Sequence, residues 1–110
     1  MSLRANLERM LQRGQDSPLL RFSLGGECLK AGDLVAAIEH LRHAVEANPG
    51  YSAAWKLLGQ AHAATGNAGR AAEVYEQGIA AAEAGGDLQA AREMAVFLKR
   101  LRRAGSEPGQ

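Results

Sequence analysis

Apolar side chains recur at three- and four-residue intervals along most of the chain, which places them on one face of a series of helices. The helix boundaries are marked as well. Ser17 precedes Pro18, a capping residue before the proline that suits a first helical turn. Gly32 can end one helix and Asp33 can cap the next. The pattern predicts an all-α protein of about six helices. The apolar set of the segment after Asp33 is Leu34, Ala37, Ile38, Leu41, Ala44 and Val45.

The sequence matches itself at an offset of 34 residues. Leu24-Gly25 aligns with Leu58-Gly59. Because a mid-helix glycine costs about 1 kcal/mol relative to alanine, its recurrence predicts that two helix backbones approach too closely for a side chain. Each unit is predicted to be a pair of helices. Other aligned pairs are Gly32 with Gly66, Ala37 with Ala71, Leu41 with Tyr75, and Val45 with Ile79.

These positions resemble the tetratricopeptide repeat. The resemblance covers units 18–51 and 52–85, and it implies a right-handed superhelix of helix hairpins. Segment 1–17 is expected to hold one helix, 86–104 a capping helix and 105–110 a disordered tail. The matching residues are Trp55-x2-Leu58-Gly59-x2-His62 with Ala71-x3-Tyr75, and Leu24-Gly25-x2-Cys28 with Ala37-x3-Leu41 and Pro49.

The chain departs from the repeat pattern at several positions. Arg21 stands where the first unit would have tryptophan, and Cys28 and His62 stand where tyrosine is usual. Glu83 replaces a proline, so the helix there is expected to continue to Gly85.

The last helix lacks the repeat residues at the same offset, where Gln89, Arg92 and Glu93 replace tryptophan, leucine and glycine. A third full copy is therefore absent, and the helix is expected to cap the second unit. The apolar residues expected to cover that unit are Leu88, Ala91, Ala95 and Leu98.

The N-terminal segment also fits the repeat phase. Residues 3–13 would be the second helix of a half repeat packed on the first full unit, and a flexible arm or a dimerising helix is the alternative. The apolar positions in phase are Leu3, Leu7, Met10 and Leu11.

Composition and charge narrow the class of protein. A single cysteine cannot form an internal disulfide, which fits a reducing compartment. No apolar run has the length of a signal peptide or a membrane span, so a cytoplasmic location is expected. Net charge is +1, but the last helix ends in Lys99, Arg100, Arg102 and Arg103. These cations suit a helix C-terminus, and they could also contact an acidic protein or, less readily, nucleic acid.

Tetratricopeptide proteins generally bind peptides or proteins on the concave face that the first helix of each repeat lines. The resemblance therefore implies a non-catalytic interaction module without a cofactor. A self-associating assembly protein, dimerising through the groove or the N-terminal helix, is the alternative. The expected groove residues are Leu19, Phe22, Gly26, Leu29 and Lys30, then Ala53, Lys56, Gln60, Ala63 and Ala64, with Met94 and Phe97 from the cap.

Two features of this groove are open. The N-terminal helix could instead cover Leu19, Phe22 and Leu29, and Lys56 and Gln60 could meet a peptide carboxylate or simply be solvated. One branch of the family clamps a C-terminal carboxylate with lysine and asparagine. That clamp is absent, because the first unit has Phe22 and Gly26 at its positions.

Candidate catalytic and metal groups are few. His40 and His43 lie three residues apart but lack a clear third ligand, so a solvated helix face explains them better. Cys28 and His62 share one repeat position that faces a neighbouring helix, and packing explains this pair better than thiol chemistry does. We expect neither an enzyme nor a metal site.

Overall fold

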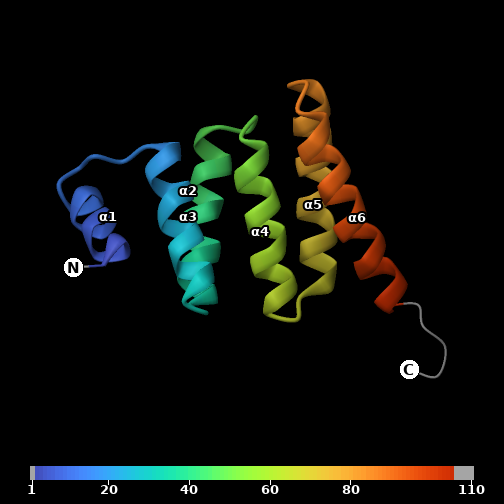
Figure 1. Ribbon diagram of the computed structural model, residues 1–110, viewed down its shortest axis with the longest axis horizontal. Coiled ribbons are helices and arrows are strands. Elements are labelled where there is room, and N and C mark those ends of the chain that lie inside the picture. The colour runs from blue at the N-terminus through green and yellow to red at the C-terminus, as the bar shows by residue number, and fades with distance from the viewer. Residues whose placement is uncertain (1, 106–110) are drawn as a thin grey trace.

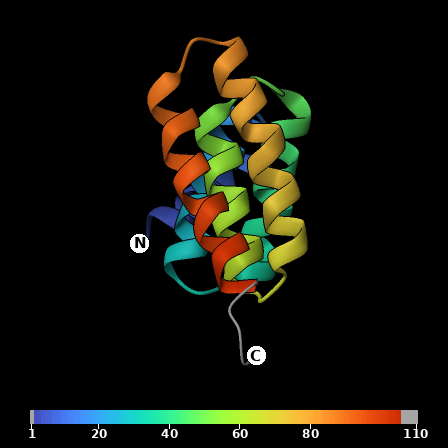
Figure 2. The same cartoon turned by 90° about the vertical axis from the view of Figure 1, so that its right-hand side faces the viewer.

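The computed structural model describes residues 2–105, which form six helices in a row (Figure 1). Figure 2 looks along this row and shows two layers, α2, α4 and α6 in one and α3 and α5 in the other. The expected all-α repeat architecture is confirmed. The helices are α1 (Leu3–Gln12), α2 (Pro18–Lys30), α3 (Leu34–Ala47), α4 (Ser52–Ala64), α5 (Ala68–Ala84) and α6 (Leu88–Gly105).

The turns within the two units have the same construction. Gly32 and Gly66 have φ values of 78° and 85°, which an L-residue rarely adopts. The next residue, Asp33 or Asn67, donates its backbone N–H to the carbonyl five residues earlier and caps the following helix with its side chain. The predicted boundaries at these turns are therefore confirmed.

Side chains of the second helices fill the space beside the aligned glycines. A methyl group on Gly25 would overlap Leu41, and one on Gly59 would overlap the Tyr75 ring. The sequence predicted that two helix backbones meet at these glycines. Instead, a side chain of the second helix lies against each glycine, and the two side chains occupy the same position in their repeats. Leu41 and Tyr75 are both buried as a result.

Trp55 connects the two halves of the core. It packs against one buried cluster that extends from α2 to α5 and against a second formed by α5 and α6. A methyl group on Gly78 would lie 2.7 Å from Trp55 Cβ and 2.5 Å from Met94 Sδ, so Gly78 provides the room for both side chains. The Trp55 indole N–H donates to the Pro49 carbonyl at 2.8 Å, which satisfies its polar group.

The register of α6 differs from the expectation. The helix buries Ala90, Ala91, Met94 and Leu98, whereas Leu88 is 54% exposed and Ala95 is exposed as well. Leu88 and Ala95 were therefore wrongly expected to cover the second unit.

The length of α5 explains this error. Helix α5 has 17 residues and α3 has 14, and the connection at 85–87 is one residue shorter than that at 48–51, so α6 begins 36 positions after α4, not 34. At that spacing, Ala91, Met94, Ala95 and Leu98 correspond to Trp55, Leu58, Gly59 and His62. Met94 is buried as Leu58 is, whereas Ala95 is exposed at the position of the buried Gly59, and no second helix follows α6 in the described part of the chain.

The two ends of the chain also bear on the predictions. Helix α1 packs on α2, and none of its residues is fully buried; its assignment as a half repeat stays a prediction. At the other end, Gly105 belongs to α6, so the tail was placed one residue too early. The expected disorder of 106–110 lies outside the described residues. Helix α5 continues to Ala84 with Gly85 as its cap, as the replacement of proline by Glu83 predicts.

Alanine at Gly59 is expected to destabilise the fold, and alanine at Gly26 is expected to stabilise it. At Gly59 the new methyl group would meet the rigid Tyr75 ring, and overpacking costs about 1–3 kcal/mol. At Gly26 the nearest atom, Leu57 Cδ1, would be 3.7 Å away, so the gain in helix propensity of up to about 1 kcal/mol remains. Urea unfolding of both variants measures the difference. Equal midpoints would contradict the insertion of the Tyr75 ring beside Gly59.

Candidate functional site

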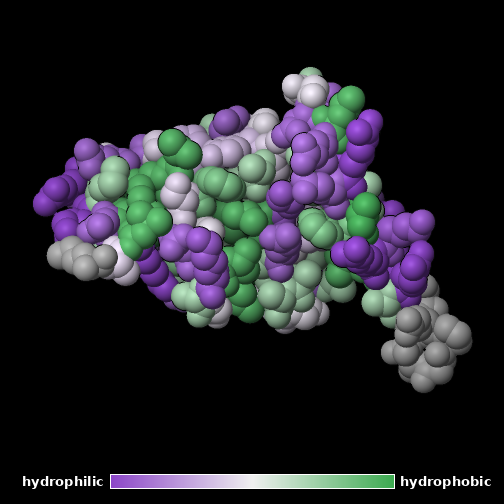
Figure 3. Space-filling view, in the orientation of Figure 1, coloured by the Kyte–Doolittle hydropathy of each residue, from purple (hydrophilic) through white to green (hydrophobic). Residues whose placement is uncertain are grey.

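A continuous apolar surface lies over α2 and α4, and we call it the α2–α4 face. Figure 3 shows hydrophobic side chains gathered over these helices. Leu19 is 65% exposed, whereas Phe22 and Leu29 are half-buried against the first-unit core. This arrangement gathers the apolar part of the expected groove on one side of the molecule. The α2–α4 face consists of Leu19, Phe22, Gly26, Leu29, Tyr51 and Leu57.

Two residues of the α2–α4 face were not expected. The Tyr51 ring lies 5.0 Å from that of Phe22, and Leu57 approaches Gly26 from α4. Tyr51 lies in the loop before α4, outside the helical positions considered, and only its contact with Phe22 brings it to this surface. Leu57 could have been found, since it is an apolar residue that the repeat core does not use.

Helix α1 lies beside the α2–α4 face. It packs on α2 and contacts no other described helix along its backbone. Leu7 and Met10 of α1 form a cavity of about 200 Å³ together with Leu19 and Leu20 of α2. The helix thus forms one wall beside Leu19.

The polar residues of the expected groove have partners within the chain or remain at its edge. Lys56 donates to Glu93 of α6 at 3.3 Å, and this ion pair spans the space between α4 and α6. Lys30 donates to Glu27 at 2.9 Å on the surface of α2. Gln60 is half-buried on α4. Because Lys56 already forms an ion pair with the Glu93 carboxylate, its charge is only partly available to a ligand.

A second cavity lies between the C-terminal parts of α4 and α6, and we call it the α6 cavity. Its volume is about 240 Å³. It includes Ala63 and Phe97, both expected in the groove, but not Met94, which is fully buried beside Gly78. The placement of Met94 in the groove was therefore wrong. The α6 cavity is lined by Ala63, Tyr75, Phe97, Arg100, Leu101 and Ala104.

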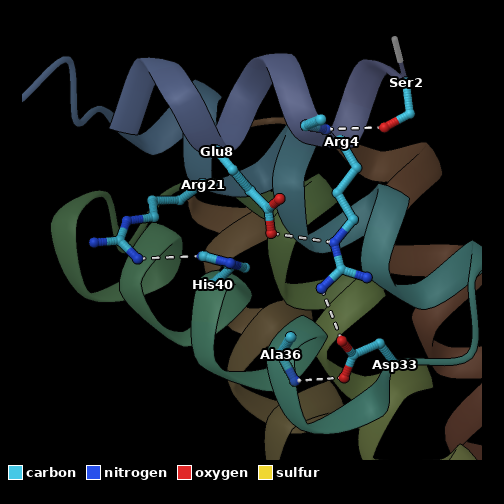
Figure 4. A network of polar contacts seen from close by, with 8 residues as sticks. Ser2, Arg4, Glu8, Arg21, Asp33, Ala36 and His40 are labelled. Carbon is cyan, nitrogen blue, oxygen red and sulfur yellow. Dashed lines mark hydrogen bonds and ion pairs between the residues drawn. The ribbon is translucent and has the colours of Figure 1, made fainter. Parts of the chain in front are cut away.

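A polar network joins α1 to the start of α3 (Figure 4). Arg4 donates to Glu8 at 3.3 Å and to Asp33 at 2.8 Å. Asp33 also accepts the N–H of Ala36, so one carboxylate both caps α3 and holds α1. The Arg4 hydrogen bond is the main cause that lowers the pKa of Asp33. This network fixes the position of α1 beside the α2–α4 face.

The histidines and the cysteine have structural surroundings. Arg21 lies 3.2 Å from His40 Nδ1 (Figure 4), which must accept because a guanidinium only donates. Burial and the Arg21 cation lower the pKa of His40, so it is not simply part of a solvated face. His43 borders a different, polar cavity with Arg21 and Asp16. Cys28 is fully buried, and burial raises the pKa of its thiol, which disfavours the reactive thiolate.

Two searches of the described residues bear on other classes of site. Among residues 2–105, no three His, Cys, Asp or Glu side chains are grouped so that they could hold a metal ion. None of the six helices combines the length and apolar character that crossing a bilayer requires.

Comparison with known proteins agrees with this architecture. The tetratricopeptide repeat family matches residues 28–95. A TPR repeat-containing protein of Pseudomonas aeruginosa is 53% identical over 98 residues, which are 89% of this chain and 93% of that protein. The chain therefore belongs to the tetratricopeptide repeat family, whose domains generally mediate protein–protein interactions.

Solved structures show the same fold. The solution structure of a Bordetella parapertussis protein superposes with a TM-score of 0.83 at 41% identity, over 94% of this chain and 90% of that one. The crystal structure of a tetratricopeptide repeat domain protein from Salinibacter ruber gives a TM-score of 0.75 at 25% identity, over 84% of this chain and all of that one.

The contact between α4 and α6 predicts a loss of stability in acid. The Ser52 hydroxyl donates to Asp87 at 2.6 Å, and this bond, followed by that from the Ala90 N–H, lowers the pKa of Asp87 below its ordinary 3.8. A carboxyl group whose pKa is lower in the folded protein than in the unfolded chain stabilises the fold at pH values above its unfolded pKa. This stability is lost as the pH falls through its folded pKa. Asp16 and Asp33 shift in the same direction.

Replacing Asp87 by Asn is expected to lower the stability at neutral pH and to make the remaining stability less dependent on acid. Urea midpoints at pH 7 and pH 3 for both proteins measure this change. An unchanged acid dependence would show that Asp87 has no such role.

Proposed function

We propose that this protein is a non-catalytic module that holds an extended segment of a partner protein along the α2–α4 face. The observation that carries the proposal is the exposed apolar surface itself. Leu19 is 65% exposed, and Phe22 and Leu29 remain only half-buried although they pack against the core. An exposed cluster of this kind, bordered by polar residues, is typical of an interaction surface.

The arrangement suits an extended chain more than a compact small molecule. Gly26 lies between Phe22 and Leu29 and leaves room for a ligand backbone to approach α2. The Lys56–Glu93 pair borders the same surface and offers both a donor and an acceptor to peptide groups. Catalysis would need a nucleophile, a base or a metal group in a pocket, whereas this surface is mainly apolar.

The variant Leu19→Glu tests the proposal, and Val35→Glu is its matched control. Both residues are exposed aliphatic side chains in a first helical turn, at 65% and 79%, but Val35 lies on α3, outside the α2–α4 face. A carboxylate at position 19 is expected to weaken partner binding about tenfold, because the charged group must lose its hydration when the apolar contact forms. Stability should change by no more than about 0.5 kcal/mol in either variant.

The measurement is capture of partners from a lysate of the source cells, followed by the dissociation constant of each captured protein after purification. If both variants lost partner capture to the same extent, or if neither lost it, binding at the α2–α4 face would be contradicted. Sedimentation of the purified chain tests the other reading. A dimer that Leu19→Glu dissociates and Val35→Glu leaves intact would favour self-association through the same surface.

A further inference from the structure

The α6 cavity has the size and the walls of a site for one apolar side chain. Its volume is about 240 Å³, and its walls are mainly apolar, from Ala63, Phe97 and Leu101. A dry apolar cavity of about 150 Å³ can hold a benzene ring. The α6 cavity can therefore accommodate a side chain as large as phenylalanine or leucine. Its lining residues come from α4, α5 and α6.

Tyr75 supplies a polar group that the chain itself does not use. Its side chain is 2% exposed and lines the α6 cavity. Its hydroxyl has no hydrogen-bond partner among the described residues. Every polar side-chain atom that is fully buried among these residues does have a partner. The hydroxyl is therefore accessible from the cavity. Burial raises the pKa of Tyr75 to about 12, so the group is a neutral donor at physiological pH. Buried tyrosine hydroxyls usually have a partner, which a ligand would provide here.

The surroundings of the α6 cavity are mainly cationic, although Glu76 lies nearby and pairs with Arg102. Arg100 lines the cavity and forms no ion pair or hydrogen bond with the described residues. Lys99 is exposed on the same helix turn, while Arg102 is paired with Glu76 at 2.9 Å. No acidic residue follows Glu93 within α6. An unpaired guanidinium beside an apolar recess attracts a carboxylate and can bind it bidentately.

We propose that the α6 cavity receives one bulky apolar side chain from an acidic segment of a partner protein. A carbonyl or carboxylate oxygen of that segment accepts a hydrogen bond from the Tyr75 hydroxyl, and a flanking carboxylate pairs with Arg100. The inference rests on the proposed function and specifies the partner's chemistry at the α6 end. Ala63 lies on α4 in line with Lys56 and Gln60, so one extended chain could reach both surfaces.

Nucleic acid is a weaker occupant for this cavity. Tyr75 is too deeply buried for its ring to stack on a base, and a phosphate would leave the apolar walls without contact. An acidic peptide uses the recess, the hydroxyl and the cation together.

The test uses a short fluorescein-labelled peptide with one phenylalanine flanked by aspartates, titrated with the full chain and followed by anisotropy. Arg100→Glu is expected to weaken binding about tenfold. Arg92→Glu is the matched control, because it makes the same charge change on an exposed part of α6 away from the cavity. It should change binding less than about twofold. Tyr75→Phe keeps the ring beside Gly59 and should weaken binding about fivefold, as expected for one hydrogen bond.

Several results would overturn the inference. These are an absence of saturable binding, equal weakening by Arg92→Glu and Arg100→Glu, or an unchanged affinity when serine replaces the peptide phenylalanine. Tighter binding of a labelled oligothymidine that Arg100→Glu abolishes would assign the surface to nucleic acid. A dimer that Arg100→Glu dissociates would assign it to a second copy of the chain. Circular dichroism and urea midpoints establish that each variant is folded.

The two proposals can fail separately. Loss of partner capture in Leu19→Glu but not in Arg100→Glu or Tyr75→Phe would leave the α2–α4 face as the binding surface and reject the α6 cavity. Peptide binding that depends on Arg100 and Tyr75, with capture unaffected by Leu19→Glu, would reject the α2–α4 face instead.

Discussion

The insertion of a side chain beside a helical glycine is the contact on which the rest of this structure depends. Leu41 occupies the space beside Gly25, and the Tyr75 ring occupies the equivalent space beside Gly59. Because each glycine lacks a side chain, the two helices of a unit approach closely and form one buried layer. Gly78 extends the arrangement by accommodating Trp55 from one side and Met94 of α6 from the other.

The two ends of the stack are held by different physical interactions. On the α6 side, Trp55 and Met94 join a continuous apolar core. On the α1 side, Arg21 replaces the repeat tryptophan and makes two hydrogen bonds to Asp16, of 2.9 and 3.0 Å, beside its contact with His40. Helix α1 therefore depends on polar contacts and half-buried leucines, and exposed ion pairs contribute little free energy. We expect α1 to be the least strongly held helix of the six.

The candidate surfaces follow from this asymmetry. The α2–α4 face includes Phe22 and Leu29, which are half-buried, and α1 contacts only α2 among the described helices. The α6 cavity lies between the C-terminal parts of α4 and α6, with Tyr75 of α5 among its lining residues. Both surfaces leave apolar side chains accessible, and the α6 cavity adds one tyrosine hydroxyl.

The sequence by itself determined the helices, the family and most of the core. Glycine and proline restrict the backbone locally, and the apolar period shows which side of each helix is buried. It also predicted Leu19, Phe22 and Leu29 as groove residues, because these apolar positions lie outside the repeat pattern. Only the tertiary structure decided the register of α6. This helix begins 36 positions after α4, so an offset of 34 residues assigns the wrong side of α6 to the core. The pairing of Lys56 with Glu93 and the α6 cavity were likewise decided there, because each depends on contacts between residues distant in the chain.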